Sequence, residues 1–197
     1  MKIEPITLEG HVVYLEPLSM DYVEDLYEAA QDPSIWLYMP TNPGRSRADM
    51  VAWIRAALRG QEEGTDLPFV IIDRATNRVV GATRYMNVSS KDRGLEIGWT
   101  WLAKEARRTG INTECKYLLL RHAFEQIDCI AVEFRTGSVN FQSRNAIERL
   151  GAKFDGILRS HQRYTNGALR DTCVYSITAA EWPTVKAHLE WQMRKPR

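Results

Sequence analysis

Residues 107–112 read RRTGIN and are followed, after Thr113 and Glu114, by an apolar stretch, CKYLLLRHAFEQI, with helical spacing. The first turn of a helix leaves backbone N–H groups free and carries a partial positive charge. Gly110 lets the backbone approach a ligand closely, and Arg107 and Arg108 add charged donors. This combination is typical of a phosphate or diphosphate site.

Two common phosphate-loop motifs do not fit this stretch. The Gly-Lys-Ser/Thr ending of a Walker A loop does not occur here, and neither does the G-x-G-x-x-G dinucleotide pattern. The alternative is an ordinary strand-to-helix turn with solvated arginines. Spacing alone does not decide between the two.

The elements that must position this stretch can be predicted from residue patterns. β-Branched and aromatic runs predict strands at 11–18, 67–73, 79–88, 95–103, 130–136, 154–164 and 170–178. Apolar spacing and capping signals predict helices over 19–31, 46–63, 112–127 and 140–150, and one that follows Thr178. The turn at 165–169 joins the last two strands. We expect one mixed α/β domain over residues 1–197.

Composition restricts the classes of function. The net charge of +1 gives no global attraction to nucleic acid or to a membrane surface. Cys115, Cys129 and Cys173 are far apart, so we expect buried free thiols and neither a zinc site nor a disulfide framework. No apolar run has the length of a membrane span, and the first residues do not resemble a signal peptide. These features predict a cytoplasmic protein without a metal.

Several motifs resemble one known family in combination. RRTGIN, read as R-x-x-G-x-N, is similar to the Q/R-x-x-G-x-G/A pyrophosphate loop of the GCN5-related N-acetyltransferases. LEIGW before it, and RTGSVNFQSRNAIERLGAKFDGILR after it, look like the branch that contains the ribosomal-protein N-terminal alanine acetyltransferases. Asn112 replaces the usual small residue of the loop, and Gly137 replaces an acid that is usual in this branch.

The resemblance covers nearly the whole chain and implies a GNAT-like fold. That fold has a central, mostly antiparallel mixed sheet, splayed between the fourth and fifth strands, with helices on both faces. The cosubstrate would be acetyl-CoA, with its pantetheine arm in the gap between strands 95–103 and 130–136. The implied contacts are the loop Arg107, Arg108, Thr109, Gly110, Ile111, Asn112 and Thr113, the backbone near Trp101 and Leu102, and Asn140 and Ser143.

Two side chains are the candidates for catalysis. Glu96 stands six residues before Leu102, a spacing often found for the catalytic glutamate of the family, and burial would raise its pKa toward neutrality. The alternative is a solvent-facing strand carboxylate or a partner of Arg84 or Arg93. Ile147 occupies the place of the family's usual acid, a tyrosine, so Ser143 would serve the departing sulfur instead. Helix capping is the alternative role for both Ser143 and Asn140.

An acceptor site is expected beside these residues. The apolar loop 34–39, with Trp99 and Trp101, would frame it; the alternative for the tryptophans is core packing. Strand alternation predicts both indoles on one face, and Glu96 with Gly98 and Thr100 on the other. Trp182 and Trp191, in the last helix, would pack on the sheet or on the partner in a homodimer.

The expected activity is acetyl transfer from acetyl-CoA to a primary amine, by direct attack in a ternary complex. The acceptor would be a protein N-terminus, an amino acid or a small amine. The alternative is a non-catalytic acyl-CoA-binding module of the same fold. A nucleic-acid partner is not expected, because the chain has neither a basic balance nor a recognised motif for one.

Overall fold

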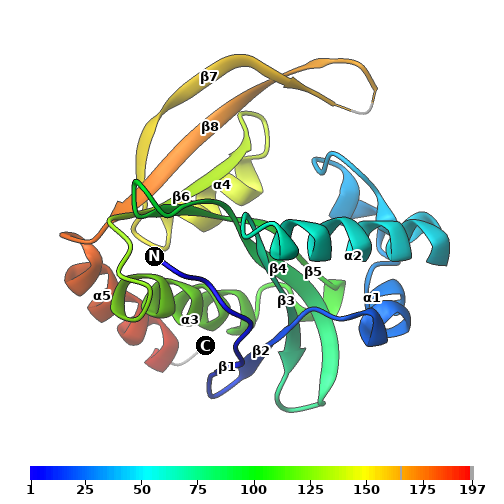
Figure 1. Ribbon diagram of the computed structural model, residues 1–197, viewed down its shortest axis with the longest axis horizontal. Helices are drawn as coiled ribbons and strands as arrows, with labels where there is room; N and C mark the ends of the chain where they lie inside the picture. The colour runs from blue at the N-terminus through cyan, green and yellow to red at the C-terminus, as the bar shows by residue number, and fades with distance from the viewer. Residues whose placement is uncertain (165, 196–197) are drawn as a thin grey trace.

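The computed structural model describes residues 1–164 and 166–195, so residue 165 of the expected 165–169 turn lies outside it. These residues form one eight-stranded sheet in the order β1-β2-β3-β4-β5-β6-β8-β7 (Figure 1). The strands are β1 Leu8–Glu9, β2 Val13–Pro17, β3 Leu67–Asp73, β4 Arg78–Ser89, β5 Gly94–Leu102, β6 Ala131–Gly137, β7 Lys153–Arg163 and β8 Leu169–Thr178. The helices are α1 Val23–Ala29, α2 Arg47–Glu62, α3 Ile111–Glu125, α4 Phe141–Glu148 and α5 Trp182–Arg194.

The expected mixed α/β fold is confirmed, with local differences near the N-terminus. The two-residue strand β1 has no pattern of its own and was not predicted. The segment predicted as a helix from Ser19 begins as a 3-10 turn, Met20–Tyr22, because the Ser19 hydroxyl accepts from the N–H of Asp21. The expected loop 31–44 contains two further 3-10 turns, Pro33–Trp36 and Pro43–Arg45.

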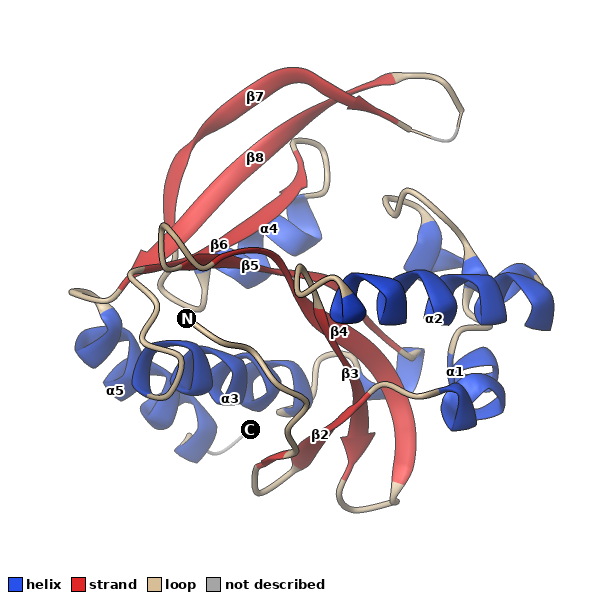
Figure 2. Ribbon diagram, viewed as in Figure 1, coloured by secondary structure: helices blue, strands red, loops and turns tan. Residues whose placement is uncertain are grey.

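Helices cover both faces of the sheet, as expected (Figure 2). Apolar side chains of α3 and α5 pack on one face, and those of α1 and α2 on the other. Fully burying a side chain such as Phe69 or Ile54 stabilises a fold by roughly 1.5–3 kcal/mol. In α5, Trp182 is buried against Phe124 and Tyr117 of α3, whereas Trp191 is 58% exposed.

The sheet separates between β5 and β6, the fourth and fifth of the strands predicted from sequence. These strands are parallel and pair only from Gly94 with Ala131 to Glu96 with Glu133. All the other neighbouring strands are antiparallel. Beyond Glu96 the two strands diverge, which leaves backbone groups free along both sides of the gap.

A bulge in β5 changes which side chains share a face. Ala82 lies opposite Trp101, and Arg84 opposite Gly98, so β5 carries one more residue than β4 between these pairs. Trp99 has a φ of 51°, a left-handed value that is rare for a bulky residue.

The bulge makes the expectation about faces wrong for Glu96. Both indoles pack against Trp53 of α2. Arg84, which lies opposite Gly98, also stacks on Trp53, so Gly98 and Glu96 belong to this same face. Thr100 instead faces α3, where its hydroxyl accepts from Lys116 at 2.5 Å. Glu96 therefore shares its face with the tryptophans and not with Thr100.

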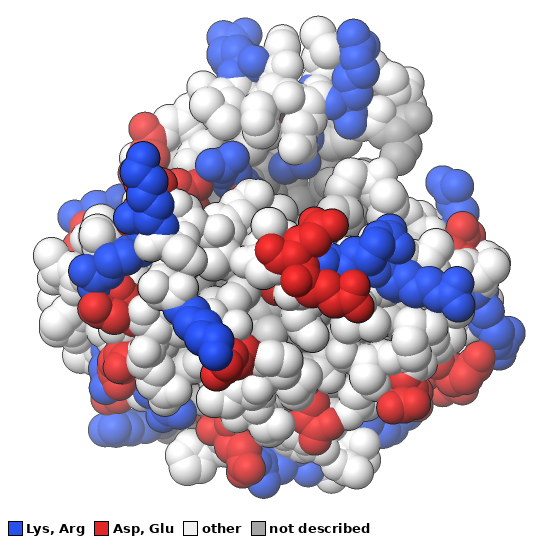
Figure 3. All heavy atoms as spheres, in the orientation of Figure 1, with Lys and Arg blue, Asp and Glu red and all other residues white. Residues whose placement is uncertain are grey.

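All three cysteines are free and buried, as predicted. Within residues 1–164 and 166–195, no three His, Cys, Asp or Glu side chains group closely enough to hold a metal ion. Over the same residues, every helix is too short or too polar to cross a bilayer. On the face shown in Figure 3, basic and acidic side chains are interspersed.

Candidate active site

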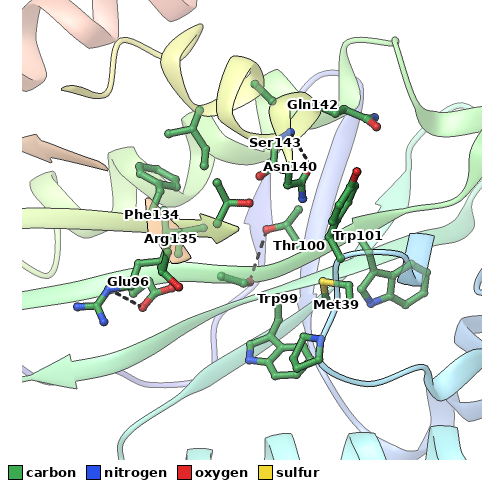
Figure 4. Close-up of a pocket in the computed structure, with 18 of the residues that line it drawn as sticks. Met39, Glu96, Trp99, Thr100, Trp101, Phe134, Arg135, Asn140, Gln142 and Ser143 are labelled. Atoms are coloured by element: carbon green, nitrogen blue, oxygen red, sulfur yellow. Dashed lines mark hydrogen bonds and ion pairs between the residues drawn. The ribbon is translucent and has the colours of Figure 1, made fainter. Parts of the chain in front are cut away.

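The separation of β5 from β6 opens a cavity of about 400 Å³. Its wall comes mainly from β5, β6, α4 and the loop at 34–40 (Figure 4). Seven of the residues predicted from sequence as catalytic or cosubstrate-binding line it: Glu96, Trp101, Leu102, Arg107, Asn112, Asn140 and Ser143. Trp99 and the loop residues Tyr38 and Met39 also line it, as expected for an acceptor site.

Glu96 is a buried carboxylate at this cavity. It is 6% exposed, and its Oε2 accepts from Asn87 Nδ2 at 2.8 Å and lies 3.6 Å from Arg135 Nε. Burial raises the pKa of Glu96, while the Asn87 hydrogen bond and the Arg135 charge oppose this shift. A Cβ at Gly98 would stand only 2.6 Å from Met86 Sδ, so the packing of this side chain beside Glu96 requires a glycine. Among the alternatives, exposure and pairing with Arg84 or Arg93 are excluded, since those arginines pair with Asp66 and Asp128.

The backbone of Leu102 faces the gap. The N–H of Ala103 donates to the Val80 carbonyl of β4 at 2.8 Å, so the groups of Ala103 point toward β4. Backbone groups alternate in direction along a strand, so those of Leu102 point away from β4. The Leu102 carbonyl accepts from Arg107 Nε at 3.0 Å, on the gap side. The N–H of Leu102, but not that of Trp101, is therefore directed to the cavity.

At the start of α4, capping and cavity roles fall on different residues. Asn140 is the N-cap, and its Oδ1 accepts from the N–H of Ser143 at 3.1 Å. The capping alternative is thus right for Asn140 and wrong for Ser143. The Ser143 hydroxyl has no hydrogen-bond partner in the described part of the chain, and Ser143 lines the cavity. Ile147, at the position of the family's tyrosine, lines the same wall.

The start of α3 presents free backbone donors. The N–H of Ile111 is capped by the Thr109 hydroxyl at 3.2 Å, and the N–H of Glu114 bonds to the Gly110 carbonyl. For the N–H groups of Gly110, Asn112 and Thr113, no described residue supplies an acceptor within hydrogen-bond distance. Gly110 has a φ of −70°, so a left-handed backbone is not what requires a glycine at this position.

Side chains of the loop have mixed roles. Arg107 holds the 32–36 turn to β5: besides its bond to Leu102, it donates to Ser34 Oγ at 2.8 Å and pairs with Asp32 at 3.2 Å. Arg108 is exposed and free to meet an anion. Thr113 is buried and its hydroxyl accepts from Arg149 at 3.4 Å. Thr109, Gly110 and Ile111 line a second hollow, shared with His11 and Arg74.

Sequence reasoning missed several polar residues of the main cavity, among them Asn87, Lys116, Arg135 and Arg170. Lys116 is 6% exposed and its ammonium bonds the hydroxyls of Thr100 and Thr83; burial lowers its pKa. Its signal was a single lysine within the apolar run CKYLLL of a helix that is mostly buried. The other three stand in strands, where only the tertiary pairing reveals their proximity to Glu96.

Comparison with known proteins identifies the family. A model described as "Acetyltransferase (GNAT) domain" matches residues 13–153. The chain belongs to the GNAT acetyltransferase family. It is 30% identical over 175 residues to the "Putative ribosomal N-acetyltransferase YdaF" of Bacillus subtilis (strain 168), which covers 85% of this chain and 90% of the relative.

Solved structures show the same fold for this acetyltransferase. The GCN5-related N-acetyltransferase from Brucella melitensis has a TM-score of 0.91 and 27% identity, covering 98% of this chain and 87% of its own. Mycobacterium smegmatis RimJ, in complex with CoA-disulfide, has a TM-score of 0.81 and 23% identity, covering 97% and 94%. The chain is thus a GNAT N-acetyltransferase that uses acetyl-CoA.

Proposed function

We propose that this enzyme transfers the acetyl group directly to a primary amine within a ternary complex. One observation carries the proposal: a single cavity brings together the Glu96 carboxylate, the Leu102 N–H and the free Ser143 hydroxyl. These are a base, an oxyanion donor and a proton donor, the three groups that aminolysis of a thioester needs. The acceptor class is a protein N-terminus, an amino acid or a small amine.

Acetyl-CoA enters the gap between β5 and β6. Its diphosphate binds the free N–H groups at the start of α3, helped by Arg108 and by the partial charge of the helix. Its pantetheine arm lies along the unpaired part of the two strands, against the apolar residues Ile97, Phe134 and Ile147. Mycobacterium smegmatis RimJ, which shares the fold, was solved with a CoA derivative.

The chain's own groups then move the protons. Glu96 takes a proton from the acceptor ammonium through a water, and the free amine attacks the thioester carbonyl. The N–H of Leu102 stabilises the oxyanion while the N–C bond forms. As the C–S bond breaks, the nitrogen releases its second proton to solvent, and the Ser143 hydroxyl donates a proton to the sulfur and recovers one from solvent.

The test is a panel of amines and N-terminal peptides assayed by the free thiol released from acetyl-CoA. Direct transfer predicts initial-rate lines that intersect when both substrates are varied. It also predicts that the mass of the enzyme is unchanged after incubation with acetyl-CoA alone. Parallel lines with an acetylated enzyme would contradict direct attack, and CoA binding without thiol release from any amine would favour the non-catalytic module.

A further inference from the structure

Arg170 is a cation of the cavity wall whose donors are only partly used. It stands near the start of β8, opposite Gln162 of β7, and its Nη1 donates to Gln162 Oε1 at 2.7 Å. Its Nε is buried and has no hydrogen-bond partner among the described residues. An arginine stays charged at every working pH, so this guanidinium retains an unmet demand for an acceptor.

Two other arginines of this part of the molecule, Arg135 and Arg159, differ from Arg170 in having carboxylate partners. Arg135 pairs with Glu133 at 2.7 Å and with Glu96 at 3.6 Å. Arg159, on the outer hairpin, pairs with Asp171 at 2.8 Å. For Arg170, no carboxylate of residues 1–164 or 166–195 lies within 4.0 Å. Guanidinium groups that face a ligand cavity without an internal anion are suited to bind carboxylate or phosphate bidentately.

The sheet register places Arg170 on the side of the sheet that carries Glu96. Glu96 lies opposite Glu133, and Glu133 opposite Ser176 of β8. Because side chains alternate along β8, Thr172 and Arg170 lie on the same face of the sheet as Ser176. Thr172 and His161 also line this cavity, and His161 Nδ1 lies 3.2 Å from the Thr172 hydroxyl. An acceptor whose amine meets Glu96 can therefore direct a second group toward Arg170.

We propose that Arg170 determines acceptor specificity by binding a negatively charged group of the acceptor, a carboxylate or a phosphate. The preferred acceptors are then small amines that also carry a carboxylate or a phosphate, and not uncharged amines or peptide N-termini. This inference rests on the proposed function, because it assigns the acceptor of the same site. The apolar side formed by Tyr38, Met39 and Trp99 contacts the rest of such a molecule.

The probes are matched pairs that differ in one charge. The twenty L-amino acids and a series of ω-amino acids are compared with their carboxamides, and phosphoethanolamine with ethanolamine. A third arm uses tripeptides that begin with the best amino acid. We expect kcat/KM to be at least tenfold higher for the anionic member of a pair, and the series to show whether carboxylate or phosphate is preferred.

Variants connect that preference to Arg170. Arg170→Gln should lower kcat/KM for the anionic acceptor tenfold to a hundredfold, mainly through KM, and change the uncharged partner less than twofold. Arg170→Lys should restore part of the loss, and the exposed Arg159→Gln is the matched control. Because the Arg170 charge lowers the pKa of Glu96, its removal moves the acid limb to higher pH, so each variant is compared on the plateau above its own acid limb.

The outcomes separate this inference from the proposed function. Equal rates for acids, amides and tripeptides, or a loss on Arg170→Gln that is the same for charged and uncharged acceptors, would overturn the role of Arg170 and leave the acetyltransferase intact. A marked preference for tripeptides would assign the site to protein N-termini instead. Absence of thiol release with every amine would refute the proposed function itself.

Discussion

Replacing Glu96 with glutamine tests the proposed base with little change of shape. In the Glu96→Gln variant, the amide carbonyl can still accept from Asn87 Nδ2, which lies 2.8 Å from the present carboxylate. The substitution removes the negative charge and the ability to take a proton. The main steric neighbours, Met86 and Gly98, meet a side chain of the same size.

The expected loss is large because the base acts in the transition state. General-base catalysis contributes roughly 10²–10⁴ in rate, or about 3–5 kcal/mol of barrier. Solvent hydroxide or water can replace part of this catalytic contribution at high pH. We therefore expect kcat to fall about a hundredfold or more at neutral pH, with KM for acetyl-CoA nearly unchanged, since Glu96 does not belong to the cosubstrate loop.

The pH profile gives a second signature. Burial raises the pKa of Glu96, and its ionised form is the active one, so wild-type kcat/KM rises with pH through a value above the ordinary carboxyl range. Glu96→Gln should lose this acid limb. A raised folded-state pKa contributes stability that is complete at low pH and is lost as pH rises through that value. At neutral pH the glutamine variant should therefore melt no lower than the wild type.

The assay is thiol release measured between about pH 5 and pH 9, with a thermal melt of each variant. Glu133→Gln is the control, because Glu133 pairs with Arg135 and its charge raises the pKa of Glu96. This control should keep its rate at high pH and shift the acid limb to lower pH. A Glu96→Gln enzyme that retains at least a third of wild-type activity with the same acid limb would refute the assignment of the base.

Substitutions at four further positions test neighbouring groups. Asn87→Gly tolerates the left-handed backbone at this position, where φ is 50°, and removes the hydrogen bond that lowers the pKa of Glu96. The acid limb of the pH–rate profile should therefore move to higher pH, with the rate at high pH retained. Ser143→Ala should lower kcat about tenfold without lowering the melting temperature, because Asn140 caps α4, and an unchanged kcat would exclude a role for the hydroxyl. Asn140→Ala should destabilise the fold by about 1 kcal/mol, a melting shift of about 2–4 °C in scanning calorimetry. Gly110→Pro fits the observed φ and deletes one N–H, so CoA affinity measured by titration calorimetry should fall roughly tenfold, whereas Gly110→Ala should bind within about threefold of wild type.

The elements around the site could be predicted because their residue patterns are local. β-Branched and aromatic residues specify β3 and β5, and Ser46 caps α2 by accepting from the N–H of Asp49. The anion site at the start of α3 could be predicted for the same reason, since Gly110 and the free N–H groups of the first helical turn are adjacent in the chain. Glu96 was found through a family spacing, and its burial at the cavity supports that choice.

The remaining parts of the site depend on contacts between distant segments. The ion pair that ties Arg107 to Asp32 joins positions far apart in sequence, so this arginine was predicted as a free cation when it is largely a structural tie. Asn87 reaches Glu96 only because β4 and β5 pair in one register. Likewise, Arg170 is near the site only because its strand, β8, pairs directly with β6. No local pattern encodes these neighbours.

The bulge at Trp99 explains how a packing feature produces the geometry of the site. With regular alternation, Trp99 would face α3 together with Leu95 and Ile97, which pack in that half of the core. The extra residue turns both indoles toward Trp53 and bends β5, and the pairing with β6 ends at Glu96, just before the bend. Glu96 lies three residues before the bulge and Leu102 three residues after it, so the carboxylate and the N–H donor border the same opening. Tryptophan is rarely found at a left-handed φ, so the residue types gave no sign of the one insertion that sets this arrangement.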